Sequence, residues 1–182
     1  MKHSLFKFIK NAILKNNLEI LFDHILELLT VLNDKRIFIS PSSFKKTIII
    51  HVASIIEALL LHILREKNLQ DKVELKEIWE YKNIKLIYKL SKNQEIIWAI
   101  RERKKETKKL EKLNFLEINR LCLKQKIISN NIFKKAEQVR ELRNELHIGG
   151  IDKIKREYSN EDLIFTLNAM NNIINIAFRF LS

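Results

Sequence analysis

Glycine and proline are scarce in this chain, and their scarcity limits the folds that it can adopt. Two glycines and one proline occur among 182 residues. Turn-dense β folds use these residues at many sharp turns, whereas helix interiors exclude them. The hydrophobic fraction of 46% is rich in Leu and Ile. The sequence therefore predicts an all-α helical bundle that forms a single domain over residues 1–182, with an N-terminal helix within residues 1–40 as a candidate appendage.

The charge balance predicts an anionic partner. The formal net charge is +12 and the isoelectric point is near 9.8, which favours association with phosphate groups or anionic membrane surfaces. The single cysteine, Cys122, excludes an intramolecular disulfide and a multi-cysteine zinc site, and it is typical of a small core residue. The N-terminal residues mix charged and apolar side chains without the pattern of a signal peptide, so we expect a cytoplasmic protein.

The most apolar stretch, Thr47–Leu64, falls slightly short of the roughly 20 apolar residues that span a bilayer. It also carries ionisable side chains, so it favours a central buried helix over a membrane span, and no membrane partner is expected. Its polar residues share one helical stripe and comprise His51, Ser54, Glu57 and His62. We interpret the stripe as satisfied buried polar groups. The alternative is that His51 and Glu57 line a site.

The other segments mostly have the spacing of amphipathic helices. Apolar residues at helical intervals predict helices over Ser4–Asn33 with a break near Asn16, over Phe115–Ile128, after a cap at Asn130, and after a cap at Ser159 or Asn160. Val73–Leu90 mixes helix and strand signals and is interpreted as helical. Gln94–Leu113 could be a long exposed helix or a β-hairpin, so a small irregular or hairpin insertion is expected around residues 94–113.

A basic run follows within Arg101–Lys112. It is either a solvated surface or an electrostatic contact with a nucleic-acid backbone. The run contains no aromatic residue, so base stacking is not indicated there. The candidate RNA-binding residues are Arg101, Arg103, Lys104, Lys105, Lys108 and Lys109.

The candidate catalytic residues lie in QVRELRNELHIGG, Gln138–Gly150, and are Arg140, Arg143, Asn144 and His147. At 3.6 residues per turn all four fall on one helical face, and the adjacent glycines end the helix. A histidine can transfer protons near neutral pH while arginines hold a phosphate, a combination that suits metal-independent attack of an RNA 2′-hydroxyl on the neighbouring phosphate. The alternative is that the arginines pair with Glu137, Glu141 or other acidic residues.

The LRNELH sequence, Leu142–His147, resembles the signature of the HEPN superfamily, in which an Arg, usually followed by a polar residue such as Asn, is separated from a His by four to six intervening residues. Three residues separate Arg143 from His147, and six separate Arg140 from it. The apolar stretch Ser54–Leu64 is also similar to the helix that precedes the motif helix in HEPN-like chains.

The resemblance implies a homodimeric α-bundle that pairs two motif helices in a composite cleft, and an RNA-cleaving toxin or phage-defence effector without metal or other cofactor. The alternatives are a non-catalytic HEPN-like module that binds RNA, a nucleotide or a protein such as a nucleotidyltransferase-type antitoxin, and a purely structural helical domain.

Overall fold

The computed structural model describes residues 5–34, 41–67, 72–145 and 157–182, although within the strands the side chains of residues 72–77, 105 and 106 are not described. The chain divides into two compact units. One comprises Met1–Asn68 together with Asn114–Ser182, and the other is Leu69–Leu113.

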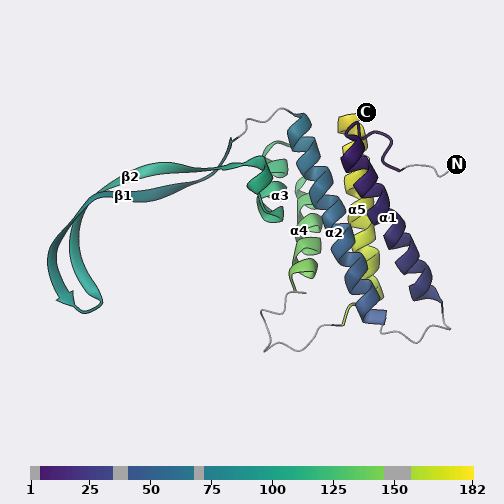
Figure 1. Cartoon of the computed structure of the whole chain (residues 1–182), viewed down its shortest axis with the longest axis horizontal. Coiled ribbons are helices and arrows are strands. Elements are labelled where there is room, and N and C mark those ends of the chain that lie inside the picture. Colours follow the sequence, from purple (N-terminus) through teal and green to yellow (C-terminus); the bar gives the residue numbers. More distant parts are fainter. Residues whose placement is uncertain (1–4, 35–40, 68–71, 146–156) are drawn as a thin grey trace. The chain divides into compact units, whose positions relative to one another are not determined.

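In the residues that the structure describes, the first unit contains five helices that pack as a bundle (Figure 1). Helix α2 packs against all four of the others. It is long and apolar enough to cross a membrane, yet most of its apolar window is buried within the bundle. The prediction of a central buried helix is thus confirmed. The bounds are α1 Ala12–Asn33, α2 Pro41–Glu66, α3 Phe115–Lys124, α4 Asn130–Asn144 and α5 Asn160–Leu181.

Side-chain caps set the starts of these helices. Asn11 accepts a hydrogen bond from the backbone N–H of Leu14, so α1 starts later than predicted, and it continues through Asn16 without the expected break. Ser129, and not Asn130, caps α4. Ser159 forms a capping box with Asp162 at α5, which confirms one of the two predicted caps.

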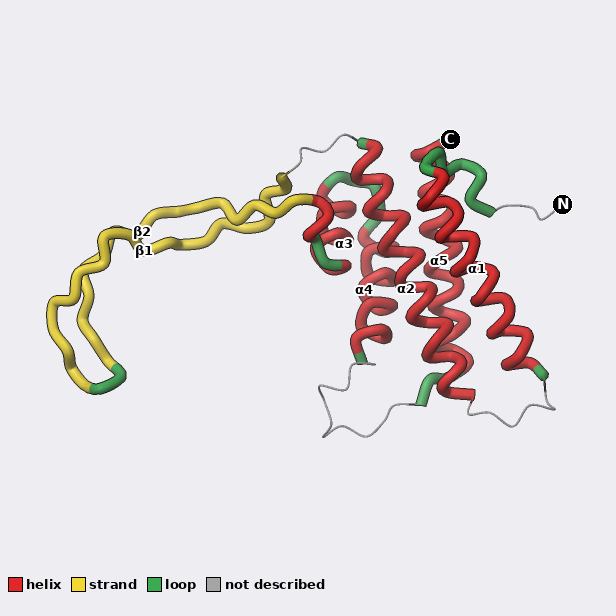
Figure 2. The backbone as a smooth tube through the Cα atoms, in the orientation of Figure 1, coloured by secondary structure: helices red, strands yellow, loops and turns green. Residues whose placement is uncertain are grey.

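The second unit contains a long antiparallel β-hairpin, so the all-α prediction is wrong (Figure 2). Strand β1 spans Lys72–Ser91, strand β2 spans Gln94–Lys109, and a 3-10 turn, η1, spans Leu110–Lys112. The helix predicted over Val73–Leu90 is a strand, because its β-branched and aromatic residues suit a pleated surface and its backbone groups pair with β2. The insertion expected around residues 94–113 supplies the second strand of this hairpin.

The irregularities of the hairpin all fall on β1. At each of the four register shifts β1 contains one more residue than β2, as in a β-bulge. Asn83, in one of these shifts, has a φ of 51°, a conformation that asparagine tolerates better than most residues. Strand β2 therefore keeps a regular alternation, and alternate residues of β2 define the two faces of the hairpin.

Candidate functional site

Arg143 in the last turn of α4 is anchored by α2. Its Nη1 lies 2.8 Å from Oε2 of Glu57, and the two side chains are 32% and 27% exposed. An ion pair that is shielded from water on most sides fixes a guanidinium better than a surface pair does. The fold thus joins two candidate residues that lie 86 positions apart.

Arg140, one turn earlier, is held by different carboxylates. Its Nε donates to Oε2 of Glu137 at 2.9 Å, and its Nη2 lies 3.6 Å from Oε1 of Glu141. The other oxygen of Glu137 accepts a hydrogen bond of 2.6 Å from the amide of Asn119, which is fully buried. Both arginines therefore make the carboxylate contacts that the sequence left open as the alternative to phosphate binding.

Of the two remaining members of the predicted quartet, the structure describes only Asn144. Asn144 is the last helical residue, and its side chain is exposed. His147 and the adjacent glycines Gly149 and Gly150 lie outside the described residues. The structure consequently brings together Arg143 and Glu57, with Arg140 and Asn144 on neighbouring positions of α4.

Tyr158, which belongs to no motif that the sequence analysis recognised, contacts the last turn of α4. Its hydroxyl donates to the carbonyl oxygen of Leu142 at 3.4 Å, and its backbone N–H donates to Oγ of Ser42 at 3.2 Å. The ring is buried against Ile49 and Leu142, with Phe165 packed beside them. A buried tyrosine is stabilised when its hydroxyl has a partner, and here that partner is a carbonyl in the last turn of the motif helix.

The polar stripe of α2 does not converge on one site. Glu57 contacts α4, whereas the ring of His51 lies 4.8 Å from that of His24 on α1. Ser54 donates to the carbonyl of Ile50 within its own helix. Burial, together with the nearby His24, lowers the pKa of His51. Of the two candidate site-lining residues, only Glu57 contacts an arginine of the motif.

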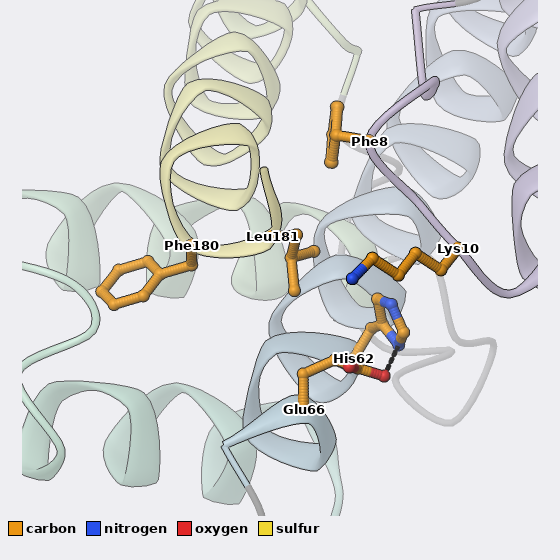
Figure 3. A pocket seen from close by; sticks show the side chains of 6 residues that line it. All are labelled: Phe8, Lys10, His62, Glu66, Phe180 and Leu181. Carbon is orange, nitrogen blue, oxygen red and sulfur yellow. Dashed lines mark ion pairs between the residues drawn. The ribbon is translucent and has the colours of Figure 1, made fainter.

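A small pocket of about 150 Å³ lies at the C-terminal end of α2 (Figure 3). Nδ1 of His62 lies 3.9 Å from Oε1 of Glu66, which forms an ion pair when the imidazole is protonated, and burial lowers the pKa of His62 more than Glu66 raises it. Figure 3 shows Lys10 reaching toward this pair. The lining residues are Phe8, Lys10, His62, Glu66, Phe180 and Leu181, and none belongs to the α4 motif.

The candidate RNA-binding residues lie on β2, in the second unit. The side chains of Arg101, Arg103, Lys104 and Lys109 are exposed, and that of Lys108 is partly buried. The side chain of Lys105 is not described.

The described residues offer no thiolate or metal site. Burial raises the pKa of the Cys122 thiol to about 12. In the part of the chain that the structure describes, no group of three or more His, Cys, Asp or Glu residues could hold a metal ion.

The chain matches no protein-family model, and neither a curated protein nor a solved structure is significantly similar to it.

Proposed function

We propose that this protein is a metal-independent endoribonuclease of HEPN type that acts as a toxin or phage-defence effector. The observation that carries the proposal is the contact between Arg143 and Glu57, which fixes a guanidinium four positions before His147. About a third of the arginine side chain remains exposed, so N–H groups that do not face Glu57 can reach a ligand.

The proposed reaction divides proton transfer and charge stabilisation between these residues. In a homodimer, neutral His147 of one protomer removes the proton of an RNA 2′-hydroxyl, whose oxygen attacks the adjacent phosphorus. The bond from phosphorus to the 5′ oxygen then breaks, and the partner subunit's His147, in its protonated form, gives a proton to the leaving oxygen. The products are a 2′,3′-cyclic phosphate and a 5′-hydroxyl.

Arg143 would bind the phosphate whose negative charge increases in the transition state. A guanidinium that is already held in place contributes more to this stabilisation than a freely rotating one, because less reorganisation is needed during the reaction. Arg140, which Glu137 holds in a similar way, would contact a neighbouring phosphate. Asn144 is exposed at the end of α4 and would orient the imidazole or the substrate.

The test is incubation of total RNA with purified protein in EDTA, followed by analysis of the fragment ends. We expect wild-type protein to leave 2′,3′-cyclic phosphates. His147→Ala should lower the cleavage rate by at least about a hundredfold. Arg143→Lys keeps the charge but loses the planar fork, and we expect at least about a tenfold loss. Arg120→Ala, an exposed arginine on α3, is the matched control and should cleave normally. Equal cleavage by wild type and His147→Ala would refute the mechanism.

A second candidate function is a non-catalytic HEPN-like module. It is favoured because both arginines already pair with carboxylates of this chain, which offsets their charge. Such a module would bind RNA, a nucleotide or a protein such as a nucleotidyltransferase-type antitoxin through the same helix. A folded dimer that binds RNA but leaves it intact in the cleavage assay would establish this alternative.

Growth of the expressing cells separates the two functions. We expect the wild-type protein to inhibit growth and His147→Ala to relieve the inhibition while folding normally. Equal toxicity of the two proteins would exclude catalysis by His147 as its cause.

A further inference from the structure

One face of the β-hairpin carries two aromatic side chains of β1 opposite two arginines of β2. Trp79 pairs with Arg103, and Tyr81 pairs with Arg101. Directly paired residues of an antiparallel sheet point to the same face, and positions two apart along a strand also share it. We call these four residues the aromatic–arginine row. Strand β1 thus supplies the aromatic rings that are missing from the basic run of β2.

Both guanidinium groups lie over the ring of Trp79. The guanidinium carbon of Arg101 lies 4.0 Å from the centroid of the Trp79 ring, and that of Arg103 lies 5.1 Å from it. Both distances are typical of cation–π contacts. Trp79 is 46% exposed and Tyr81 is 54% exposed, so the row is accessible from solvent.

The opposite face of the same region carries ion pairs between lysines and glutamates. There Lys104 pairs with Glu80 at 3.2 Å, and Lys82 pairs with Glu102, which raises the pKa of Lys82 through a hydrogen bond. Carboxylates therefore offset the charge of these lysines. Over the whole hairpin, Lys72–Lys109, basic residues are twice as numerous as acidic ones, so the segment as a whole is positive.

We infer that the aromatic–arginine row binds single-stranded RNA. The inference depends on the proposed function for the choice of RNA as partner. A guanidinium that lies over an indole ring presents N–H groups to phosphates and a planar surface to a base, while the exposed Tyr81 ring offers a second stacking surface. The positive charge complements the RNA backbone. Bound RNA would also stabilise a two-stranded hairpin, which on its own is only marginally stable in water.

The experiment measures binding of a labelled single-stranded RNA of about 16 nucleotides to the full chain. All proteins carry His147→Ala so that the RNA stays intact. We expect Trp79→Ala to weaken binding about fivefold or more, and Trp79→Phe to restore part of the affinity because it keeps a ring. Arg101→Gln should also weaken binding. Lys82→Gln removes the same charge from the opposite face and is the matched control, with an expected change of less than about twofold.

The nucleic-acid form and the salt dependence separate stacking from simple charge attraction. Stacking requires unpaired bases, so an RNA duplex of the same sequence should bind more weakly than the single strand. If Arg101 contacts a phosphate, Arg101→Gln should reduce the slope of log affinity against log salt by about 0.7. Equal affinity for single strand and duplex, or equal losses in Arg101→Gln and Lys82→Gln, would overturn the inference.

Two other partners for this face would also overturn it. If Trp79→Ala changes the molecular mass in solution and leaves RNA affinity unchanged, the row binds a second copy of the chain. If it abolishes binding to anionic phospholipid vesicles and leaves RNA affinity unchanged, the row binds a membrane. Circular dichroism of each variant shows whether the hairpin is still folded.

The inference and the proposed function can fail separately. RNA binding that requires Trp79, without cleavage by the protein with native His147, would support the inference and refute the nuclease. Cleavage by the protein with native His147, with RNA affinity independent of Trp79, would do the reverse.

Discussion

The contacts of Arg140 allow a quantitative comparison between two carboxylates of the same helix. Glu137 is partly buried, and its oxygens accept hydrogen bonds from Arg140 and from the fully buried Asn119. Glu141 is 64% exposed, and its contact with the same arginine is 3.6 Å long. Replacing either glutamate with alanine removes one negative charge from α4 and changes helix propensity equally, so the difference between the variants isolates the buried contacts.

We expect Glu137→Ala to lower the free energy of unfolding by about 3 kcal/mol, because the buried amide of Asn119 loses its acceptor and the mostly buried guanidinium of Arg140 keeps only its longer contact with Glu141. This is a large fraction of the roughly 5–15 kcal/mol that stabilises a typical domain. Glu141→Ala should change the same quantity by less than about 0.5 kcal/mol, as expected for an exposed pair.

Urea unfolding followed by far-ultraviolet circular dichroism measures both values, with the slope of the transition as a check that the same surface is exposed. If the two variants lie within about 1 kcal/mol of each other, Glu137 does not hold Arg140 and Asn119 as the structure indicates.

Three further predictions follow from buried groups of the bundle. Cys122, whose pKa is raised to about 12 and whose Sγ donates to the carbonyl of Leu60, should react with thiol reagents only upon unfolding; rapid reaction of the native protein would contradict its burial. Because burial lowers the pKa of His51, the unfolded state binds more protons than the folded state, so the free energy of unfolding should fall as the pH drops below 6.5. His51→Leu should reduce this fall in urea titrations, and an unchanged pH dependence would refute the lowered pKa of His51. Tyr158→Phe keeps the ring but removes the donor to Leu142, and should lower the unfolding free energy by about 1 kcal/mol; no loss would show that this hydrogen bond contributes nothing.

The helices of the bundle were predicted well because their signals are local. A nearly continuous apolar stretch identified α2, apolar residues at intervals of three and four positions identified α4 and α5, and Ser159 followed by Asp162 marked the start of α5. The start of α1 was misplaced because Asn11 caps it after a stretch that has similar hydrophobicity.

A hairpin was expected within residues 94–113, but its extent was wrong, because the turn lacks the usual sequence signal. The two strands meet at Lys92-Asn93, without the glycine that marks most tight hairpin turns. The bulges of β1 also interrupt the simple alternation of polar and apolar residues, so the periodicity of Val73–Leu90 did not distinguish strand from helix.

The sequence by itself determined the buried helix α2, the other helices of the bundle and the positions of Arg140, Arg143 and Asn144 on α4, since each depends on neighbours within a few positions. Only the tertiary structure decided that Glu57 contacts Arg143 and that Trp79 lies beneath Arg101. Both contacts join residues far apart in the chain. Which of several carboxylates or rings an arginine meets is set by the packing of helices and the register of strands, and no local pattern encodes that choice.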